Sequence, residues 1–455
     1  MKKIILIALL SFAITANAQE TNSVGQSVPI KSLTLKDAIS FALENKSDAK
    51  KAKLKVENSE YQIQEVRSRA LPKITANGNL TYNPVLQTSV INGAAFGQPG
   101  TTIQASFGQK WSSVAGLSLT QNIFDQSVFT GLKAAKSTRE FYQINEQLTE
   151  EQLIERVANN YYQVYVQRQN LTVLDTTYQN TVKVKNIIKG QYDNGLAKKI
   201  DLDRVLVKIS NISTQRQQVL NAVQIQENAL KFYMGMPIET KIEIPQAAFE
   251  VAPEALSEAP NTANRTEYQL MKKQEQLLEY QKKSVVAGYY PTLSLTAGYS
   301  FIGQGPQIPL GAKPVDGVYW SDFSSIGLNL KIPLFSGFET RSKVRKADIE
   351  LRSVKEDLID TKLALDLAFA NAKTQIDNSI TVIENQKKNT QLAQEVLDNT
   401  RNNYIQGLAS LTDLLDAENA LAEAQNNYTS AILGYKLAEI QLIKSKGELK
   451  TLLNN

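Results

Sequence analysis

Apolar and polar residues alternate with a period of two in four short segments of this chain. In one of them, Leu293 and Leu295 share one face, while Ser294 and Thr296 share the other. The alternation predicts β-strands over 73–82, 113–124, 292–302 and 324–335. A period of two over about ten residues is typical of a strand that crosses an outer membrane, with its apolar face toward lipid.

Each strand taken alone fits a soluble antiparallel sheet equally well, and the surroundings favour a membrane barrel. The intervening loops, 83–112 and 303–323, are long and contain many Gly and Gln residues. Aromatic residues gather near the strand ends, as in the girdles of membrane barrels: Tyr82, Trp111, Phe124, Tyr289, Tyr290, Tyr319, Trp320, Phe323 and Phe335. The smallest membrane barrels use about eight strands, so four strands must be pooled with identical copies. The pattern itself does not decide between two copies and three.

Two long stretches free of Pro predict very long helices, over 126–192 and 338–404. Apolar residues recur in them at spacings of three and four, as at Leu153, Val157, Ala158 and Tyr161. At 1.5 Å per residue each helix is about 100 Å long. Helices of this length cannot surround a compact core, so we expect them to pack in a bundle or tube.

Shorter helices are expected beside the long ones. One follows Gly195 and ends before Gly235, and others cover 263–288, 411–446 and 34–70. By length, the helix after Gly195 and the helix over 263–288 together match one long helix. The helices over 411–446 and 34–70 also match one. We therefore expect two short helices stacked end to end beside each long helix, which gives four helical rows per chain.

The chain is a tandem duplication. Tyr-Asp-Asn-Gly-Leu-Ala at 192–197 corresponds to Tyr-Ile-Gln-Gly-Leu-Ala at 404–409. We divide the mature chain into a first repeat over 19–235, a connector over 236–262 and a second repeat over 263–455. The connector contains four Pro residues, and we expect it to pack around the outside of the tube. A duplication on this scale indicates that an architecture, rather than one site, carries the function.

The N-terminus predicts export. Met1, Lys2 and Lys3 precede the apolar stretch 4–14, and Ala16-Asn17-Ala18 resembles a cleavage signal. Residues 1–18 are therefore interpreted as a signal peptide that is cleaved near Ala18. No later stretch approaches the roughly 20 apolar residues of a transmembrane helix. The chain has no Cys, so we expect no lipid anchor on a cysteine.

Composition excludes several kinds of chemistry. With no Cys and no His, the chain cannot form disulfides, imidazole metal sites or histidine-dependent triads. We expect no cofactor and no metal, and an enzyme is the least favoured function. The formal net charge is +5, to which Lys2 and Lys3 contribute. Such a small excess favours neither nucleic acid nor an anionic membrane surface as a partner.

Together, these patterns resemble the TolC-type family of outer-membrane efflux proteins over nearly all of the mature chain. The residues that carry the resemblance are the duplicated strand pairs, Pro-Leu-Phe-Ser-Gly at 333–337, and the run from Tyr404 to Ala417. The resemblance implies a mostly α-helical homotrimer with a twelve-strand barrel in outer-membrane lipid and a helical tunnel in the periplasm. It also implies docking to a periplasmic adaptor and an inner-membrane pump.

The resemblance implies a periplasmic gate at Asp413 and Asp416. Three residues apart, these carboxylates share one helix face, and threefold symmetry would gather six of them around a narrow lumen. Such a ring favours cations and binds multivalent ones. The alternative is that both residues complement the positive N-terminal end of the helix that begins near Thr412.

The family likeness also implies a latch and docking tips. Tyr404 and Asp201 match two latch residues, but the basic residue expected at position 409 is replaced by Ala409. Lys198, Lys199 and Arg401 are possible substitutes. The docking tips are Gly195-Leu196 and Gly407-Leu408, where a glycine that ends a helix is the simpler interpretation.

Three functions remain open at this stage. The favoured one is passive conduction of small molecules that an inner-membrane pump delivers. The same fold also serves type I protein secretion, and no residue separates the two. A periplasmic coiled-coil protein without a pore is the rival from another class, and the four alternating strands argue against it.

Overall fold

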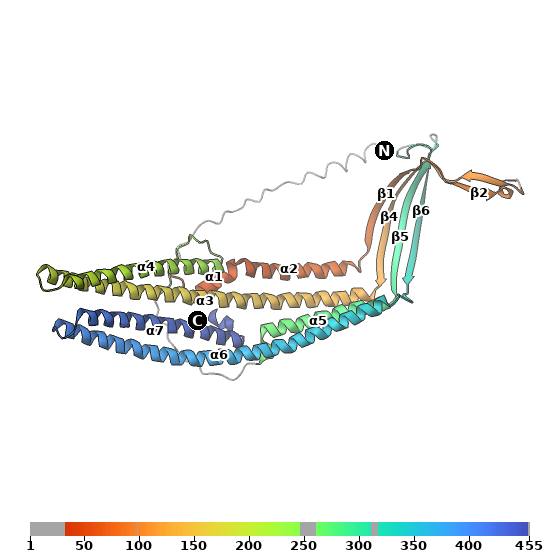
Figure 1. Cartoon of the computed structure of the whole chain (residues 1–455). Helices are drawn as coiled ribbons and strands as arrows, with labels where there is room; N and C mark the ends of the chain where they lie inside the picture. Colours follow the sequence, from red (N-terminus) through yellow and green to blue (C-terminus); the bar gives the residue numbers. More distant parts are fainter. Residues whose placement is uncertain (1–31, 98, 246–260, 311–316, 454–455) are drawn as a thin grey trace.

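The computed structural model describes residues 32–97, 99–245, 261–310 and 317–453. Its helices run side by side as one long bundle, and a four-stranded sheet stands at one end, with strands running across the direction of the helices (Figure 1). The predicted signal peptide and residues 246–260 of the connector lie outside the described residues. Within the described ranges, no helix combines the length and apolarity needed to cross a membrane.

The sheet is antiparallel and takes two strands from each repeat. Its order is β1-β4-β5-β6, formed by β1 (Lys73–Tyr82), β4 (Trp111–Phe124), β5 (Thr292–Gly305) and β6 (Tyr319–Lys331). One row across the sheet consists of Ile74, Leu119, Ala297 and Ile326, and the next row, on the other face, of Thr75, Ser118, Gly298 and Ser325. The register therefore places the apolar sets of all four strands on one face. Strands β1 and β6 are the two edges.

The last strand differs from its prediction. We expected it over 324–335, but β6 ends at Lys331 and begins at Tyr319. Pro333 has no backbone N–H to extend the ladder. Gly337 and Phe338 then adopt left-handed backbone, with φ of 59° and 65°, and turn the chain into the next helix. Leu334 and Phe335 continue the apolar pattern beyond the end of the strand, where both side chains are exposed.

The predicted strand bounds of 113–124 and 292–302 are too short, and the long loop over 83–112 contains two further strands. Strand β4 begins at Trp111, which pairs with Gly305 at the end of β5. Beyond it, β2 (Thr88–Asn92) and β3 (Thr102–Ser106) form a separate antiparallel hairpin. Figure 1 shows this hairpin pointing away from the helices.

The two long helices are α3 (Gln126–Asp193) and α6 (Glu339–Ile405), with 68 and 67 residues. The Asp125 side chain caps the start of α3, because its carboxylate accepts a hydrogen bond of 2.9 Å from the Ser127 N–H. Helix α6 has no such cap and follows directly on the left-handed Phe338. Both helices run from the sheet to the far end of the bundle (Figure 1).

The short helices are α1 (Leu35–Asn45), α2 (Ser47–Ser68), α4 (Lys199–Met234), α5 (Thr266–Val286) and α7 (Leu411–Lys446). The single helix expected over 34–70 is broken at Lys46, whose backbone is extended. The Lys46 ammonium donates a 2.8 Å hydrogen bond to the Phe232 carbonyl, three residues before Gly235. The Phe232 carbonyl also accepts the Gly235 N–H over 3.1 Å, so Lys46 adds a second hydrogen bond at the end of α4.

End-to-end stacking occurs, but our pairing of the helices was wrong. A Cβ on Gly235, just after α4, would lie 3.0 Å from the Asn45 carbonyl oxygen, so α4 meets α1 and α2. Arg265, just before α5, donates to the Ser445 carbonyl near the end of α7. Length could not decide the pairing, because either arrangement fills one long helix. Contacts between helix ends decide it.

Four rows of helices result, each running the length of the bundle. In order they are α4 with α1 and α2, then α3, then α7 with α5, and finally α6. The outer rows are thus continuous with the edge strands, since α2 leads into β1 and β6 leads into α6. Both the sheet and the helical layer have their open edges on the same two sides.

Candidate functional site at the free ends of the helices

The free end of the bundle consists of two helical hairpins, α3–α4 and α6–α7, and lies opposite the sheet (Figure 1). Both hairpins turn in the same way. Gly195 and Gly407 have φ of 73° and 76°. The N–H of Leu196 donates to the Gln191 carbonyl over 2.7 Å, and that of Leu408 to the Asn403 carbonyl over 2.8 Å. This is the six-to-one bond of a Schellman helix end.

The two turns present apolar tips to solvent. Leu196 is 81% exposed and Leu408 is 75% exposed. The left-handed glycines allow the chain to reverse without a Cβ clash, and the leucines then project from the turn. The predicted docking residues therefore include one exposed leucine on each of two equivalent turns at the same end of the bundle.

Asp413 caps the helix that contains it. The N–H and the hydroxyl of Ser410 donate to its carboxylate over 2.8 and 2.7 Å, and the Asp413 N–H donates back to the Ser410 hydroxyl over 3.2 Å. These bonds from Ser410 hold the pKa of Asp413 below its usual value. The capping role weighed in the sequence analysis is thus present, and the side chain is still exposed.

Asp416 lies one turn further along α7. It is exposed, and it forms no hydrogen bond or ion pair within the described part of the chain. Its charge acts instead on the neighbouring Lys208. Of the two predicted gate residues, Asp416 is therefore the one whose carboxylate is not occupied by the helix end.

Tyr404 and Asp201 come near each other without bonding. Burial raises the pKa of the half-buried Tyr404 hydroxyl, and the negative charge of Asp201 adds to this effect. No hydrogen bond joins them in the described residues; the Asp201 carboxylate lies 4.0 Å from Arg204. The predicted latch residues are adjacent but unlinked within one chain.

The hairpins are joined by contacts that sequence reasoning missed. The Lys208 ammonium lies 3.3 Å from a carboxylate oxygen of Glu418, and these side chains are only 11% and 5% exposed. Lys208 also donates to the Leu415 carbonyl over 3.0 Å. Burial lowers the pKa of Lys208, and Glu418 opposes that shift.

A second contact lies nearer the tip, where Arg204 donates to the Thr412 hydroxyl over 3.1 Å. By contrast, the three substitutes considered for the missing basic residue make no ion pair among the described residues: Lys198, Lys199 and Arg401. The pairing partners of Lys208 and Arg204 lie more than 200 residues away in sequence. The sequence contained one signal for these contacts, which is that basic residues at the start of α4 face a start of α7 that is rich in acidic residues.

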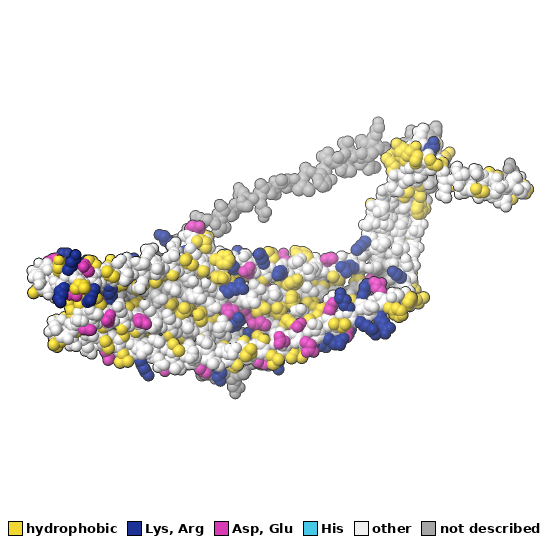
Figure 2. All heavy atoms as spheres, viewed as in Figure 1, with side chains coloured by type: hydrophobic (Ala, Val, Ile, Leu, Met, Phe, Trp, Pro, Cys, Tyr) yellow, Lys and Arg dark blue, Asp and Glu magenta, His cyan; other side chains and the backbone are white. Residues whose placement is uncertain are grey.

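Charge is divided between the hairpins. Residues 183–208, centred near Gly195, contain seven Lys or Arg and three Asp, for a net charge of +4. The corresponding window, 395–420, contains one Arg and five acidic residues, for a net charge of −4. The basic side chains on the α3–α4 end are visible at the left of Figure 2.

Comparison with known proteins assigns the fold to a family of channels. The model of the outer membrane efflux protein family matches residues 38–236 and 262–448. The chain therefore belongs to the outer membrane efflux protein family, whose members are outer-membrane channels rather than enzymes. The TolC-type assignment made from the sequence is confirmed.

Three relatives illustrate the range of the family. The chain is 25% identical to outer membrane protein TolC of Escherichia coli over 416 residues, which cover 85% of this chain and 76% of TolC. It is 23% identical to the pyoverdine export outer membrane protein OpmQ of Pseudomonas aeruginosa, over 89% of this chain and 83% of OpmQ. It is also 23% identical to the alkaline protease secretion protein AprF of that species, over 73% of this chain and 69% of AprF.

A solved structure gives the same picture of the fold. CusC, described in a study of transmembrane channel formation, matches with a TM-score of 0.73 over 93% of this chain and 95% of that chain. The two sequences are 17% identical, so this likeness concerns the fold. Taken together, the comparisons make this protein an outer-membrane exit duct.

Proposed function

We propose that this chain forms the outer-membrane duct of a tripartite efflux system and passively conducts small molecules. In this proposal an inner-membrane pump energises export, and a periplasmic adaptor connects pump and duct. The relative OpmQ, named for pyoverdine export, supports a small-molecule cargo. The relative AprF, named for protease secretion, keeps type I protein secretion as the second candidate.

The observation that carries the proposal is the pair of open edges. Strand β1 and the α4, α1 and α2 row lie on one side, and strand β6 and helix α6 lie on the other. Identical copies can therefore join side by side, with β6 beside β1 and α6 beside the α4, α1 and α2 row of the next copy. An open sheet edge in lipid would leave backbone groups unpaired, so the ring must close.

Helix α6 has the surface that such closure requires. At about 100° per residue, its apolar residues fall on two opposite faces. One face is buried against α5 and α7 and includes Ala372, Ile376 and Ile383. The other is more than half exposed and includes Leu363, Leu367, Leu392 and Val396. An apolar helix face that is exposed in one chain is the expected contact of a neighbouring copy.

We propose three copies, which give a barrel of about twelve strands with a lumen, whereas two give about eight strands with almost none. The face with Thr75 and Ser118 then lines the lumen, and the face with Ile74 and Leu119 contacts lipid. At the other end, the α3–α4 and α6–α7 hairpins of three copies alternate around the periplasmic entrance.

The entrance is proposed to be a cation-selective gate. Three copies place Asp413 and Asp416 in a ring of six carboxylates. Asp413 can serve both roles, because one of its carboxylate oxygens accepts the cap bonds and the other is not used by them. Lys208 with Glu418 and Arg204 with Thr412 hold the two hairpins of one chain together, which compensates for Ala409 in the latch. Tyr404 and Asp201 are proposed to complete the latch between chains.

The tips are proposed as the adaptor contacts. Leu196 and Leu408 are exposed on equivalent turns, so three copies present six similar apolar points around the entrance. A partner with a matching ring of apolar residues could cover them, and this would remove about 25 cal/mol per Å² of apolar surface from water.

Purification in detergent followed by native mass measurement and planar-bilayer recording tests the proposal. A trimer that forms discrete, low-conductance channels is expected, and a stable monomer that forms no channel would refute it. To separate the two cargo classes, the gene can be deleted in its own host. Accumulation of small dyes with a normal set of secreted proteins supports efflux; missing secreted proteins with normal dye export supports the second candidate.

A further inference from the structure

Basic residues gather where the helices meet the sheet. We call the segments 59–73, 125–139, 277–291 and 331–346 the basic belt, because each adjoins one strand end. These 61 residues contain thirteen Lys or Arg and five Asp or Glu, for a net charge of +8. The rest of the chain sums to −3, since the whole chain is +5. Figure 2 shows Lys and Arg side chains clustered at this end of the helices.

Most of these charges have no ion-pair partner within the described residues. Five of the thirteen cations form ion pairs, for example Arg139 with Glu60 at 3.0 Å and Lys282 with Asp348 at 2.6 Å. The other eight are exposed and form none: Arg67, Lys73, Lys133, Lys136, Lys283, Lys331, Arg341 and Arg345. The belt therefore presents a strong unneutralised field to solvent.

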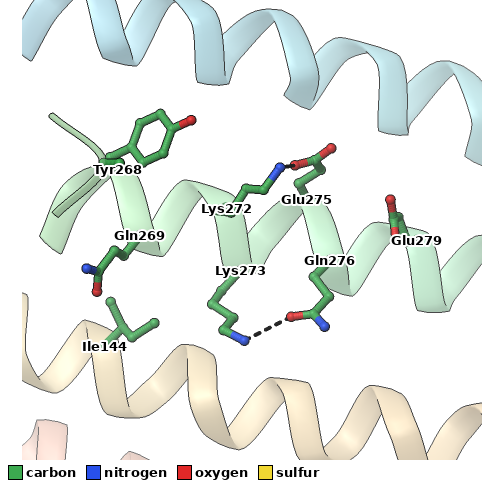
Figure 3. A pocket seen from close by; sticks show the side chains of 9 residues that line it. Ile144, Tyr268, Gln269, Lys272, Lys273, Glu275, Gln276 and Glu279 are labelled. Atoms are coloured by element: carbon green, nitrogen blue, oxygen red, sulfur yellow. Dashed lines mark hydrogen bonds and ion pairs between the residues drawn. The ribbon is translucent and has the colours of Figure 1, made fainter. Parts of the chain in front are cut away.

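Further along the same helices the charges neutralise one another. On α5, Lys272 lies 2.6 Å from Glu275, and Lys273 lies 2.7 Å from Glu140 and 2.9 Å from the Gln276 amide oxygen. Figure 3 shows the Lys272–Glu275 and Lys273–Gln276 contacts beside a cavity of about 480 Å³ that is lined by α5 and by Ile144 of α3. The contrast within one helix indicates that the belt is a local feature rather than a general basic bias.

The belt also carries aromatic side chains and small cavities. A cavity of about 200 Å³ is lined by Tyr289, Phe335, Phe338 and Arg341. A larger one, of about 770 Å³, is lined by Lys133, Lys283 and Tyr290 among others. Exposed aromatic rings beside basic side chains are typical of the level at which lipid head groups lie.

We propose that the basic belt binds the phosphate head groups of anionic phospholipids in the periplasmic leaflet of the outer membrane. Lys73 and Lys331 share the strand face of Thr75 and Ser118, which is the proposed lumen face, and are not part of this contact. The inference rests on the proposed placement of the sheet in that membrane, which puts these segments at the leaflet surface. Each basic residue close to an anionic surface adds to the attraction. The aromatic rings fix the depth of the protein in the leaflet, and the cavities provide space for a lipid head group.

The net charge of the whole chain does not reveal the basic belt. The +5 of the whole chain favoured no anionic membrane surface as a partner, because the belt's excess is offset by acidic residues elsewhere. Electrostatic attraction decays within about 8 Å at physiological ionic strength. A membrane surface therefore interacts with the belt alone and not with the acidic residues farther along the helices.

The test uses the detergent-purified assembly and native mass spectrometry with phosphatidylglycerol or phosphatidylcholine of identical chains. The wild type is expected to prefer phosphatidylglycerol, and more salt should weaken the preference. Replacing four unpaired belt residues, Lys133→Gln, Lys283→Gln, Arg341→Gln and Arg345→Gln, should lower the affinity for phosphatidylglycerol at least about tenfold. Exchanging Arg341 and Arg345 for Lys should preserve it.

The matched control removes the same charge from exposed, unpaired lysines of α6 far from the sheet: Lys362, Lys373, Lys387 and Lys388, each changed to Gln. It should keep the preference for phosphatidylglycerol. An equal loss in both variants, or an unchanged preference in the belt variant, overturns the proposal. If the belt variant separates into single chains yet keeps its lipid preference, the belt contacts the neighbouring copy instead. Channel recording on the same samples reports the proposed function independently.

Discussion

The two hairpin ends have one backbone and opposite charges. The turns at Gly195 and Gly407 share their left-handed glycines, their six-to-one hydrogen bonds and their exposed leucines. The windows around them differ by eight charges, from +4 to −4. Duplication thus preserved the shape of the hairpin, while substitution made the copies electrostatically complementary. In the proposed trimer, hairpins of like charge would repel each other, whereas hairpins of opposite charge would attract.

The difference extends to how each second helix begins. Helix α7 starts with the Ser410 and Asp413 capping box, whereas Lys198, at the start of α4, makes no side-chain cap. Asp413, which is part of the cap of α7, corresponds to Asp201 in the first hairpin. Asp201 instead lies near Arg204 and Tyr404. The Asp413 carboxylate is therefore used within its own helix, whereas Asp201 is not used in a helix cap.

The largest effect is expected where the two hairpins meet. Lys208→Met leaves the carboxylate of Glu418 buried and unpaired, which should cost about 3–5 kcal/mol. Hydrogen exchange at the tips of α4 and α7 should rise accordingly, and channels should open more often at rest. The double change Lys208→Met with Glu418→Leu should recover most of the loss. If Lys208→Met is as stable as the double variant, the pair does not join the hairpins.

Ion selectivity is expected to depend on one hairpin alone. Asp413→Ala with Asp416→Ala should remove most of the cation preference and the block by trivalent cations. It should also weaken the start of α7 by about 1 kcal/mol through the lost cap. The matched control, Asp193→Ala with Asp203→Ala, removes the same charge from the α3–α4 end and should leave selectivity unchanged. Reversal potentials in planar bilayers measure the ion selectivity of both double variants. An equal loss of cation preference in the two would contradict an acidic gate.

The shared backbone predicts equal costs at the two turns. A Cβ added to Gly195 or Gly407 would have no atom within 4 Å, so only the positive φ disfavours alanine at these positions. Each substitution should cost about 1 kcal/mol, since alanine disfavours the left-handed region. Hydrogen exchange at Leu196 and Leu408 would measure this cost. Clearly unequal values would mean that the hairpins are not equivalent in backbone energetics.

The Tyr404 and Asp201 pair should matter less than Lys208 and Glu418. Because no hydrogen bond joins the pair within one chain, Tyr404→Phe with Asp201→Ala removes only weak electrostatic contacts there, besides the proposed contact between copies. Resting conductance should rise modestly, and the stability of the separate hairpins should not change. A larger rise than for Lys208→Met would place the main latch between copies rather than within them.

The smallest effect concerns pH. Ser410 holds the pKa of Asp413 below 3.8, and a carboxyl whose folded pKa is lowered loses its stabilising contribution as pH falls through that pKa. The first turn of α7 should therefore be unaffected between pH 7 and pH 5, and should fray below pH 3.8. The start of α4, which has no such cap, provides the internal comparison. Fraying of α7 already at pH 5 would assign the protection to another group.

Local patterns predicted most elements because each is set by neighbouring residues. The period of two located strands at Lys73–Tyr82 and Thr292–Gly305, and glycines ended helices at both tips. The missed ends have local causes as well: Pro333 stopped β6 before its apolar alternation ended, and Lys46 interrupted a helical pattern that shows no Pro or Gly. The gate residues remain proposals, since only an assembly can place them around a lumen.

By itself, the sequence determined the doubled order of elements, the two faces of each strand and the identity of the turns. Only the tertiary structure decided which short helices stack, that Lys208 meets Glu418, and that the rows of helices and strands end in matching open edges. The physical reason is the distance along the chain over which each interaction acts. Backbone and side-chain preferences act between residues a few positions apart, whereas a stacked helix end or a buried ion pair depends on packing between segments some 200 residues apart.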